Sequence, residues 1–476
     1  MRQRELPYAS RGTGRKVTLR GTGAVGRVRL TNRTLRTPLT SSLLKAVWKQ
    51  DNIENAWRVI QENARTSQSD TVRKEIADFA EDSGAKIRSL CNRLSRGKFE
   101  FGQSKGIPLP KLDSRGGKTG KFRPLVLASV EARIVQRAVL NVLLTVPAIK
   151  AYVETPHSFG GLRRKIVADE NKRDNPTAVP AAIKEALKSI EDGAQFYVAA
   201  DIRSFFTKIS KSRVLTIIRS AVNDDLFVDF IEKAITTELS NMAMLREKAE
   251  DFPIQDIGVA QGNSLSPLLG NIILADFDQQ MNDGDCRCIR YIDDFIVLAP
   301  TAKAANARLR KATALLETLG MELSPEKSSK GAISLKVGFV FLGVEVKPGI
   351  IRPSTAAQRR FLTSLESAFV ESKKALFAVQ DGKTLKKTNT VIGTLKKIEG
   401  VIDGWGKHYW FCNDVPFFQE INRKVDKLVR DFLGAYRSTR EKTPPRRQRS
   451  LLGLPTLEEQ DRSPFAYPKR LAVEGA

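Results

Sequence analysis

Long apolar runs, histidine and cysteine are scarce in this chain of 476 residues, and each scarcity argues against a class of protein. No apolar run reaches the roughly 20 residues of a membrane-spanning helix, so we expect no membrane partner. The two histidines, His157 and His408, give little support to zinc- or histidine-based catalysis. Of the four cysteines only Cys286 and Cys288 are close together, which predicts neither a zinc site nor a disulfide framework. This cysteine usage fits a cytoplasmic protein.

Acidic residues are outnumbered: 79 Lys and Arg residues stand against 53 Asp and Glu residues, for a formal net charge of +26. Such a balance favours binding to a polyanion, of which nucleic acid is the most frequent. The plainer interpretation is a protein with many solvated surface lysines. With 41% hydrophobic residues the chain has enough apolar material for a packed core, so a mainly disordered chain is not expected.

Residues 1–40 are rich in Arg, Gly and Thr and contain almost no acids. We expect a flexible basic arm that lies on nucleic acid. A transit peptide has a similar composition, but the glycines disfavour the amphipathic helix that it needs. A tail without a role is the other alternative.

Helical and strand-like patterns alternate along the rest of the chain. Apolar residues at helical spacing predict helices over 41–98, 129–146, 211–235, 301–319 and 354–436. Shorter apolar runs predict strands over 195–202, 289–299 and 336–349. The glycine-rich stretch 112–124 is interpreted as a loop, and the Pro- and Arg-rich stretch 439–468 as irregular. This order indicates an α+β core with helical additions.

Three aspartates end or interrupt apolar strands. Asp201 closes "YVAAD", and the adjacent pair Asp293 and Asp294 divides "IRYIDDFIVLA". Neighbouring carboxylates are costly to bury unless a cation compensates them, and hard oxygen ligands suit Mg²⁺, with Mn²⁺ as an alternative. Two such ions can clamp the attacking and leaving oxygens of a phosphoryl transfer. For a single aspartate, a turn or capping role is the plainer interpretation.

Seven sequence blocks in one order resemble those of the reverse transcriptases, the RNA-directed DNA polymerases. The blocks are "KFRPLVLASVEARIVQRAV" (121–139), "HSFGGLRRK" (157–165), "YVAADIRSFFTKI" (197–209), "GVAQGNSLSPLLGNIIL" (258–274), "YIDD" (291–294), "LSPEKSSKG" (323–331) and "GFVFLGVEV" (338–346). A lone Y-x-D-D is a weak signal, but this succession is specific. "GVIDGWGKHYW" (400–410) also resembles the thumb motif of group II intron-like enzymes.

The resemblance implies a right-hand polymerase, with fingers and palm built from an antiparallel sheet plus helices and with a helical thumb. The expected divisions are a basic arm (1–40), a helical extension (41–106), fingers and palm (107–350), a thumb (354–437) and a basic tail (438–476). Asp201, Asp293 and Asp294 would be the catalytic metal ligands, joined by the backbone carbonyl of Ile202.

Further roles follow from the same resemblance. The residues expected to bind the incoming dNTP are Lys121, Arg123, Phe206, Gln261, Gly262 and Lys327. The primer end would lie near Tyr291, Phe341, Leu342 and Gly343, and the thumb motif would place Trp405 and Tyr409. The ring of Phe206 would leave no room for a ribose 2′-hydroxyl, which favours dNTPs over NTPs; the alternative is that Phe205 and Phe206 are both core residues.

Two departures concern kinship within the family. Many intron and retron enzymes have a small residue where Ile292 stands, and "VAQG" replaces a commoner proline before Gln-Gly. The chain is most similar to stand-alone bacterial enzymes of the unknown or defence-associated groups. An RNA template, dNTPs and a DNA product are the implied partners, with a dedicated non-coding RNA, a partner protein or a second copy of the chain as additions. The alternatives are an intron maturase and an RNA-copying RNA polymerase.

Overall fold

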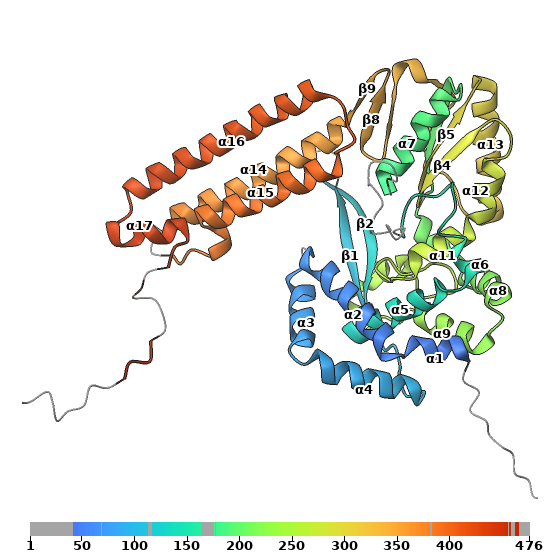
Figure 1. Cartoon of the computed structure of the whole chain (residues 1–476), viewed down its shortest axis with the longest axis horizontal. Helices are drawn as coiled ribbons and strands as arrows, with labels where there is room; N and C mark the ends of the chain where they lie inside the picture. Colours follow the sequence, from blue (N-terminus) through green and yellow to red (C-terminus); the bar gives the residue numbers. More distant parts are fainter. Residues whose placement is uncertain are drawn as a thin grey trace, which may run out of the picture. The chain divides into compact units, whose positions relative to one another are not determined.

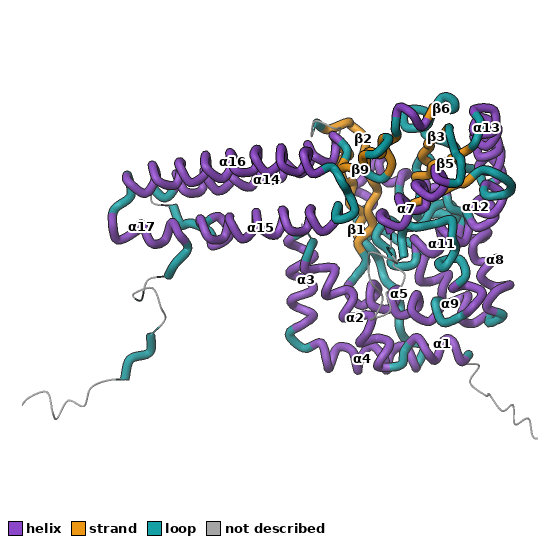
Figure 2. Tube along the Cα trace, turned by 45° about the horizontal axis from the view of Figure 1, so that its top comes forward, coloured by secondary structure: helices purple, strands orange, loops and turns teal. Residues whose placement is uncertain are grey.

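The computed structural model describes residues 41–67, 69–112, 117–162, 176, 178–380, 383–455, 457 and 462–465. The basic arm predicted for 1–40 and the last three residues of the block 157–165, residues 163–165, lie outside these residues. The described residues form one compact unit, which mixes helices with antiparallel sheets (Figures 1 and 2). None of the described helices combines the length and apolar character that a membrane crossing requires.

The predicted helical segment 41–98 forms four helices: α1 (Ser42–Val47), α2 (Gln50–Arg65), α3 (Asp70–Ala80) and α4 (Ser83–Ser95). Ser41, Ser69 and Asp82 cap the N-termini of α1, α3 and α4 through their side-chain oxygens. The buried residues of α2 recur at helical spacing, and the helix packs on α5 (Val130–Leu143).

The stretch 112–124, interpreted as a loop, is largely strand. β1 (Lys105–Leu112) pairs antiparallel with β2 (Lys118–Leu127) as a two-stranded sheet. Glycine and lysine hid the period-2 pattern of β2, in which Pro124 and Val126 are buried while Lys121 and Arg123 are exposed.

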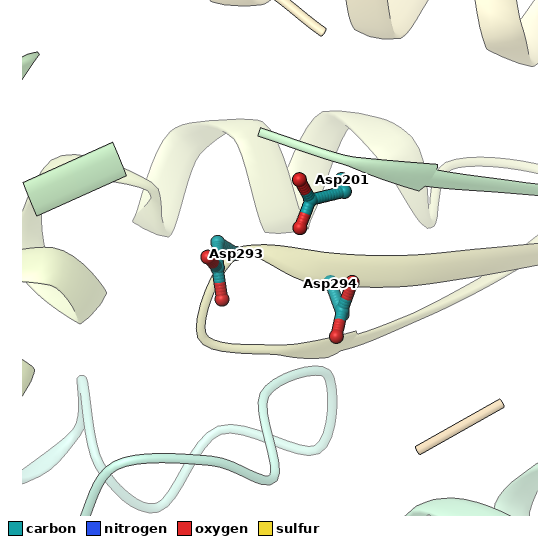
Figure 3. A group of neighbouring side chains, drawn as sticks. All are labelled: Asp201, Asp293 and Asp294. Atoms are coloured by element: carbon teal, nitrogen blue, oxygen red, sulfur yellow. The ribbon is translucent and has the colours of Figure 1, made fainter. Parts of the chain in front are cut away.

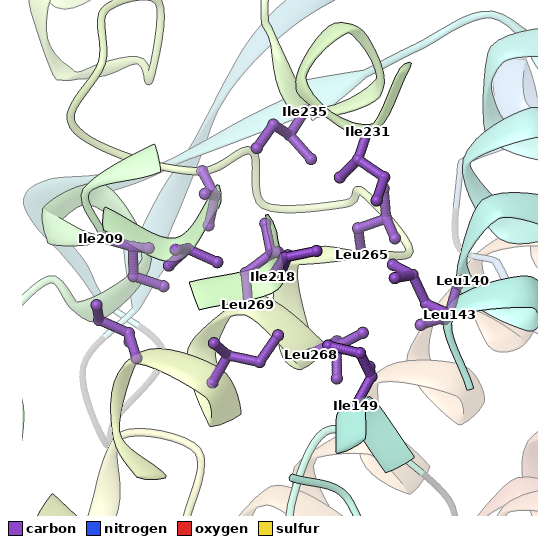
Figure 4. Packing of buried hydrophobic residues seen from close by; sticks show 14 of the residues in the cluster. Leu140, Leu143, Ile149, Ile209, Ile218, Ile231, Ile235, Leu265, Leu268 and Leu269 are labelled. Atoms are coloured by element: carbon purple, nitrogen blue, oxygen red, sulfur yellow. The ribbon is translucent and has the colours of Figure 1, made fainter. Parts of the chain in front are cut away.

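A core of helices packs against the main sheet (Figure 4). Leucine and isoleucine side chains from α5, α6, α8, α9 and α11 meet in it, among them Leu140, Ile218 and Leu268. The bounds of the helices that follow α5 in this part of the chain are α6 (Pro147–Lys150), α7 (Ala178–Glu191), η1 (Phe205–Lys208), α8 (Lys211–Val222), α9 (Asp225–Ile235), α10 (Met242–Leu245), η2 (Arg246–Asp251), α11 (Ser266–Ile273), α12 (Ala275–Met281) and α13 (Ala302–Thr318).

The main sheet has four strands in the order β4-β5-β3-β6, and all neighbours are antiparallel. Its strands are β3 (Phe196–Asp201), β4 (Arg287–Tyr291), β5 (Asp294–Ala299) and β6 (Ile333–Ser334). Phe295 and Val297 of β5 join the helical core on one face, whereas Ile296 and Leu298 join a second cluster on the other. Because both faces are covered, β5 reads as a continuous apolar run.

A second sheet and a helical bundle complete the described chain. The sheet contains β7 (Phe339–Phe341), β8 (Val344–Lys347) and β9 (Ile350–Pro353), preceded by the short helix η3 (Leu335–Val337). Helices α14 (Thr355–Ala378), α15 (Val391–His408) and α16 (Val415–Glu441) pack together around a cluster of their own, with η4 (Lys387–Asn389) before α15. In Figure 1 the three long helices lie side by side.

The prediction that 439–468 is irregular is wrong for the first part of this stretch, up to Leu452. α16 continues to Glu441, and a further helix, α17 (Pro445–Leu452), buries Leu451 completely in the bundle core. Pro445 stands in the first turn of α17, where the missing N–H of proline costs no helical hydrogen bond. The prolines that suggested irregular chain therefore begin a helix.

Candidate active site

The three predicted aspartates come together at one end of the main sheet (Figure 3). Asp201 ends β3 directly opposite Asp294, the first residue of β5, and Asp293 lies in the turn between β4 and β5. One oxygen from each carboxylate lies within 4.8 Å of the others. Asp201 is buried, and its two neighbours are partly exposed. The adjacent positions at the hairpin turn and the antiparallel pairing with β3 produce this cluster.

The charges of this cluster oppose one another. Burial, followed by the charge of Asp201, raises the pKa of Asp293 above its usual range. Burial, followed by the charges of Asp293 and Asp201, raises the pKa of Asp294 to about 7. The chain alone does not neutralise the three carboxylates, which is the condition under which a cation binds most favourably.

Lys327 supplies part of the missing positive charge. Its Nζ lies 2.9 Å from each carboxylate oxygen of Asp201. The loop that carries it is held on the edge of β3: the Ser324 N–H donates to the Asp201 carbonyl at 2.7 Å, and the Asp201 N–H donates to Ser328 Oγ at 3.3 Å. The block "LSPEKSSKG" therefore fixes the lysine beside the buried aspartate.

The β1–β2 hairpin brings further cations to the same place. The pKa of Lys111 is lowered by burial first, and then by the positive charges of Arg123, Lys327 and Lys121, while Asp201 acts in the opposite direction. Lys121 Nζ lies 3.6 Å from Glu326, next to Lys327. The predicted pair Lys121 and Arg123 thus lies near the acids. Lys111 was missed, because its strand was not recognised.

The block around Gln261 lies against the same hairpin. The N–H of Val126 on β2 donates to the Gln261 carbonyl at 3.0 Å. Gly262 has a φ of +112°, and a Cβ there would lie 2.9 Å from the Val126 carbonyl oxygen. The position therefore requires glycine for its own backbone contact with β2.

Phe205 and Phe206 lie in different environments. Phe205 is 2% exposed and belongs to the core, whereas Phe206 is only partly buried and packs on the core's edge. Their ring centroids are 5.2 Å apart. The Phe206 carbonyl accepts a hydrogen bond from the N–H of Val259 at 2.8 Å, which ties this aromatic residue to the chain leading into Gln261.

The residues expected near the primer lie in and beside the second cluster. Tyr291 ends β4, opposite Asp294. Phe341 is buried, and the turn that follows it has positive φ at both Leu342 (52°) and Gly343 (80°). These two residues form the short connection between β7 and β8.

The thumb motif joins that turn to the bundle. The Tyr409 hydroxyl donates to the Gly343 carbonyl at 3.4 Å. Trp405 stacks on Phe361 of α14 with ring centroids 4.4 Å apart and also contacts Tyr409. Trp405 therefore lies in the clusters of both the bundle and the sheets.

Ile202 follows Asp201 directly, and its backbone carbonyl remains a predicted metal ligand. Its N–H donates to the Asp293 carbonyl at 2.9 Å, so the residue after Asp201 is tied to the turn that carries Asp293. The side chain is fully buried. A direct backbone bond therefore holds the two predicted metal ligands in one unit.

The donor set fits a hard divalent cation. Three carboxylates converge, and an ammonium group, Lys327, already rests on one of them, so the cluster attracts positive charge. All-oxygen ligation suits Mg²⁺ or Mn²⁺ better than zinc or copper. Acids at the end of an antiparallel sheet, faced by cations, suit metal-dependent chemistry on an anionic substrate.

Comparison with known proteins gives the family. Residues 109–346, half of the chain, match the family model described as "Reverse transcriptase (RNA-dependent DNA polymerase)", and the chain belongs to this family. The three aspartates fall inside the matched range, as do Lys111, Lys121, Arg123, Gln261 and Lys327.

Relatives share modest identity with the chain. It is 26% identical over 230 residues to a retrovirus-related Pol polyprotein from the type-1 retrotransposable element R2 of Popillia japonica, covering 41% of this chain and 38% of that protein. It is 23% identical over 293 residues to Protein YkfC of Escherichia coli (strain K12), covering 54% of this chain and 70% of that protein. A solved partial Cas6-RT-Cas1–Cas2 complex is 20% identical with a TM-score of 0.31, covering 58% of this chain and 43% of that one. The chain thus spans about 38% of the first of these relatives.

Proposed function

We propose that this protein is an RNA-templated DNA polymerase that adds dNTPs to a primer by nucleotidyl transfer. The observation that carries the proposal is the convergence of three carboxylates beside Lys327, inside the region that matches the reverse transcriptase family. Three further cations from the β1–β2 hairpin lie close to this cluster: Lys111, Lys121 and Arg123. Acids alone would suit any metal site. Cations facing them add a place for the triphosphate of an incoming nucleotide.

In this proposal Asp201, Asp293 and Asp294 would hold two Mg²⁺ ions, with the Ile202 carbonyl as a further oxygen. Such ions would supply a lower pKa for the primer hydroxyl and neutralisation of the charge that develops on pyrophosphate. The protein's part is to hold the carboxylates together through the pairing of β3 with β5 and through the bond from Ile202 to Asp293. The raised pKa of Asp294 means that a proton competes for its metal-binding form.

The remaining residues bind and orient the substrate. Arg123 would offer a forked contact to phosphate oxygens and Lys121 a point charge, and Lys327, which contacts Asp201, would neutralise charge on the pyrophosphate. Phe206 selects the deoxyribose, and Gln261 with Gly262 supports the base pair. Tyr291 and the turn Phe341–Gly343 hold the primer end, and Trp405 with Tyr409 sets the bundle, as a thumb, against that turn.

The domain divisions follow the same proposal. Residues 107–350 act as fingers and palm and 354–437 as thumb, and 41–106 supports the fingers through the packing of α2 on α5. The basic arm and the thumb would hold the RNA through contacts to its phosphates.

The biological setting that we propose is antiphage defence, with a non-coding RNA as template or a protein partner. The alternative is a maturase that aids intron splicing. A plaque assay that compares wild type with Asp293→Ala/Asp294→Ala tests the setting: loss of protection in the variant supports it, and equal protection contradicts a polymerase-dependent defence role.

The activity itself is tested by incubating the purified chain and its co-purifying RNA with Mg²⁺ and each set of dNTPs, then sequencing the product. DNA complementary to that RNA supports the proposal. Products made only from NTPs indicate an RNA polymerase instead, and no product with any nucleotide set contradicts polymerase activity.

A further inference from the structure

A fully buried ion pair lies under the turn that carries Asp293. Arg290, on β4, is the largest fully buried side chain of the described residues. Its Nε and Nη2 donate to the two carboxylate oxygens of Asp278 on α12 at 2.7 and 2.6 Å. Asn271 Oδ1 accepts from Nη2 at 3.3 Å and also from Ser158 Oγ at 3.2 Å. The pair therefore belongs to a buried polar network.

The third arm of this guanidinium reaches the turn itself. Arg290 Nη1 donates to the carbonyl oxygen of Ile292 at 2.9 Å. Ile292 has a φ of +62°, a left-handed conformation that a β-branched residue rarely adopts. The next carbonyl, that of Asp293, accepts from Ile202. Two successive carbonyls of the turn therefore accept hydrogen bonds: that of Ile292 from the Arg290 side chain, and that of Asp293 from the backbone of Ile202.

The other side of the turn is closed by backbone. A Cβ on Gly160 would lie 2.9 Å from both the N and the Cγ1 of Ile292. The Phe159 N–H donates to the Arg290 carbonyl, and the Arg290 N–H donates to the His157 carbonyl, both at 2.9 Å. Residues 157–160 therefore pack closely against the turn. The strained conformation of Ile292 is held by this segment and by the Arg290 side chain.

We propose that Arg290, oriented by Asp278, is a positioning residue that keeps the peptide after Ile292 in the one conformation that directs Asp293 toward Asp201. The proposal rests on the proposed function, in which those two aspartates hold the metal. A buried ion pair alone contributes little net stability compared with apolar packing, so stability does not explain its presence. The hydrogen bond from Arg290 to the strained turn explains its presence, because this bond connects the Arg290–Asp278 pair to the position of Asp293.

Arginine is required here for its shape. A lysine at position 290 keeps a positive charge for Asp278, but a single ammonium cannot reach both Asp278 and the Ile292 carbonyl with the geometry of a three-armed fork. Arg290→Lys therefore separates the positioning bond from the charge. Arg287→Lys is the matched control, because Arg287 lies on the same strand but the bonds that the structure describes for its side chain go to Glu185, Pro156 and His157.

The first test measures metal binding, which does not depend on catalysis. Mn²⁺ is titrated calorimetrically into the full-length chain, wild type and variants, after circular dichroism has shown that they are folded. We expect Arg290→Lys to weaken Mn²⁺ binding about 10- to 100-fold, as loss of an outer partner of a metal ligand does, and Arg287→Lys to leave it unchanged. Unchanged Mn²⁺ affinity in Arg290→Lys overturns the proposal.

The second test is a double-mutant comparison with Ile292→Gly. Glycine adopts the positive φ without strain, so the turn then needs less support, and Arg290→Lys should weaken Mn²⁺ binding less in this background. An equal loss in both backgrounds shows that Arg290 only holds α12 on the sheet, and the positioning role is then wrong. If Arg290→Lys does not fold, Asp278→Asn carries the same two comparisons, because it loosens the guanidinium while leaving it in place.

Polymerisation by the same variants separates this inference from the proposed function. With an active wild type, Arg290→Lys should require more Mg²⁺ for half-maximal rate while its KM for dNTP stays within about twofold. If the wild type makes no DNA yet Arg290→Lys still weakens Mn²⁺ binding, the proposed function fails and the positioning role stands.

Discussion

The ammonium of Lys327 lies 2.9 Å from both carboxylate oxygens of Asp201, so a side-chain cation occupies one edge of the acidic cluster. Asp201 is buried, whereas the side chain of Lys327 is 64% exposed. The lysine can therefore leave without disturbing the core, and the aspartate cannot. A mobile cation and fixed acids suit a site that exchanges one positive charge for another.

Removal of this lysine should make the metal-free protein less stable. Lys327→Ala removes the ammonium that contacts Asp201 beside Asp293 and Asp294, and we expect a loss of up to about 1 kcal/mol near pH 8, as for other partly exposed pairs. Added Mg²⁺ should restore the melting temperature, because it replaces the lost charge. Lys330→Ala, an exposed lysine in the same loop, is the control. Equal melting temperatures for Lys327→Ala and wild type without metal would show that the ion pair is not formed in solution.

The pH dependence of activity should follow Asp294. Burial and the charges of Asp293 and Asp201 raise its pKa to about 7, and a metal ion binds the deprotonated form. At limiting Mg²⁺ the polymerisation rate should therefore rise between about pH 6 and pH 8, and saturating Mg²⁺ should shift the rise to lower pH. A rate that is flat over this range at limiting Mg²⁺ contradicts the assignment of Asp294 as a ligand.

The stability of the metal-free protein should change with pH in the opposite direction. The folded pKa of Asp294 lies above the ordinary 3.8, so the folded state binds the proton more tightly than the unfolded state does. This contribution is complete at acidic pH and is lost as the pH rises through about 7. Asp294→Asn should remove that pH dependence and raise the melting temperature near pH 8. A lower melting temperature of the variant at that pH would contradict the raised pKa of Asp294.

The sugar preference should depend on Phe206 and not on Phe205. Phe206→Ala should raise the use of NTPs relative to dNTPs at least about tenfold, measured as a ratio of kcat/KM values. Phe205→Ala should instead lower stability by about 3–5 kcal/mol, because that ring is buried in the core. If Phe206→Ala keeps the wild-type preference, the steric role assigned to this ring is wrong.

Helix α17 should contribute to the stability of the bundle. Leu451 is fully buried, so Leu451→Ala should cost about 2–5 kcal/mol. Leu454, three residues on, is 45% exposed, and Leu454→Ala should change stability by no more than about 0.5 kcal/mol. Chemical denaturation of both variants makes the comparison. Equal effects would mean that α17 does not pack as described.

Much of the acidic cluster was predictable because its signals are local. The apolar flanks of Asp293 and Asp294 defined a hairpin, and the same argument placed Asp201 at a strand end. Their convergence then needs only the antiparallel pairing of β3 with β5. The helices at 41–98 and 354–436 were also predictable, since their apolar residues recur at helical spacing over many turns.

What the sequence did not indicate depends on packing between distant segments. Lys111 was missed because the glycine-rich hairpin was interpreted as a loop. Arg290 was missed because an arginine beside a turn is ordinarily a surface residue, and only the fold brings Asp278 of α12 within reach to bury it. Leu451 was missed because proline-rich sequence near it suggested irregular chain.

The most direct test of the proposed activity is primer extension on a defined RNA template. The full-length chain, Mg²⁺, dNTPs and an annealed DNA primer are compared with the same mixture containing Asp293→Asn/Asp294→Asn, a variant that removes like charges and should remain folded. The proposed function predicts DNA complementary to the RNA from the wild type and none from the variant. No extension by the wild type, or equal extension by both proteins, would contradict it.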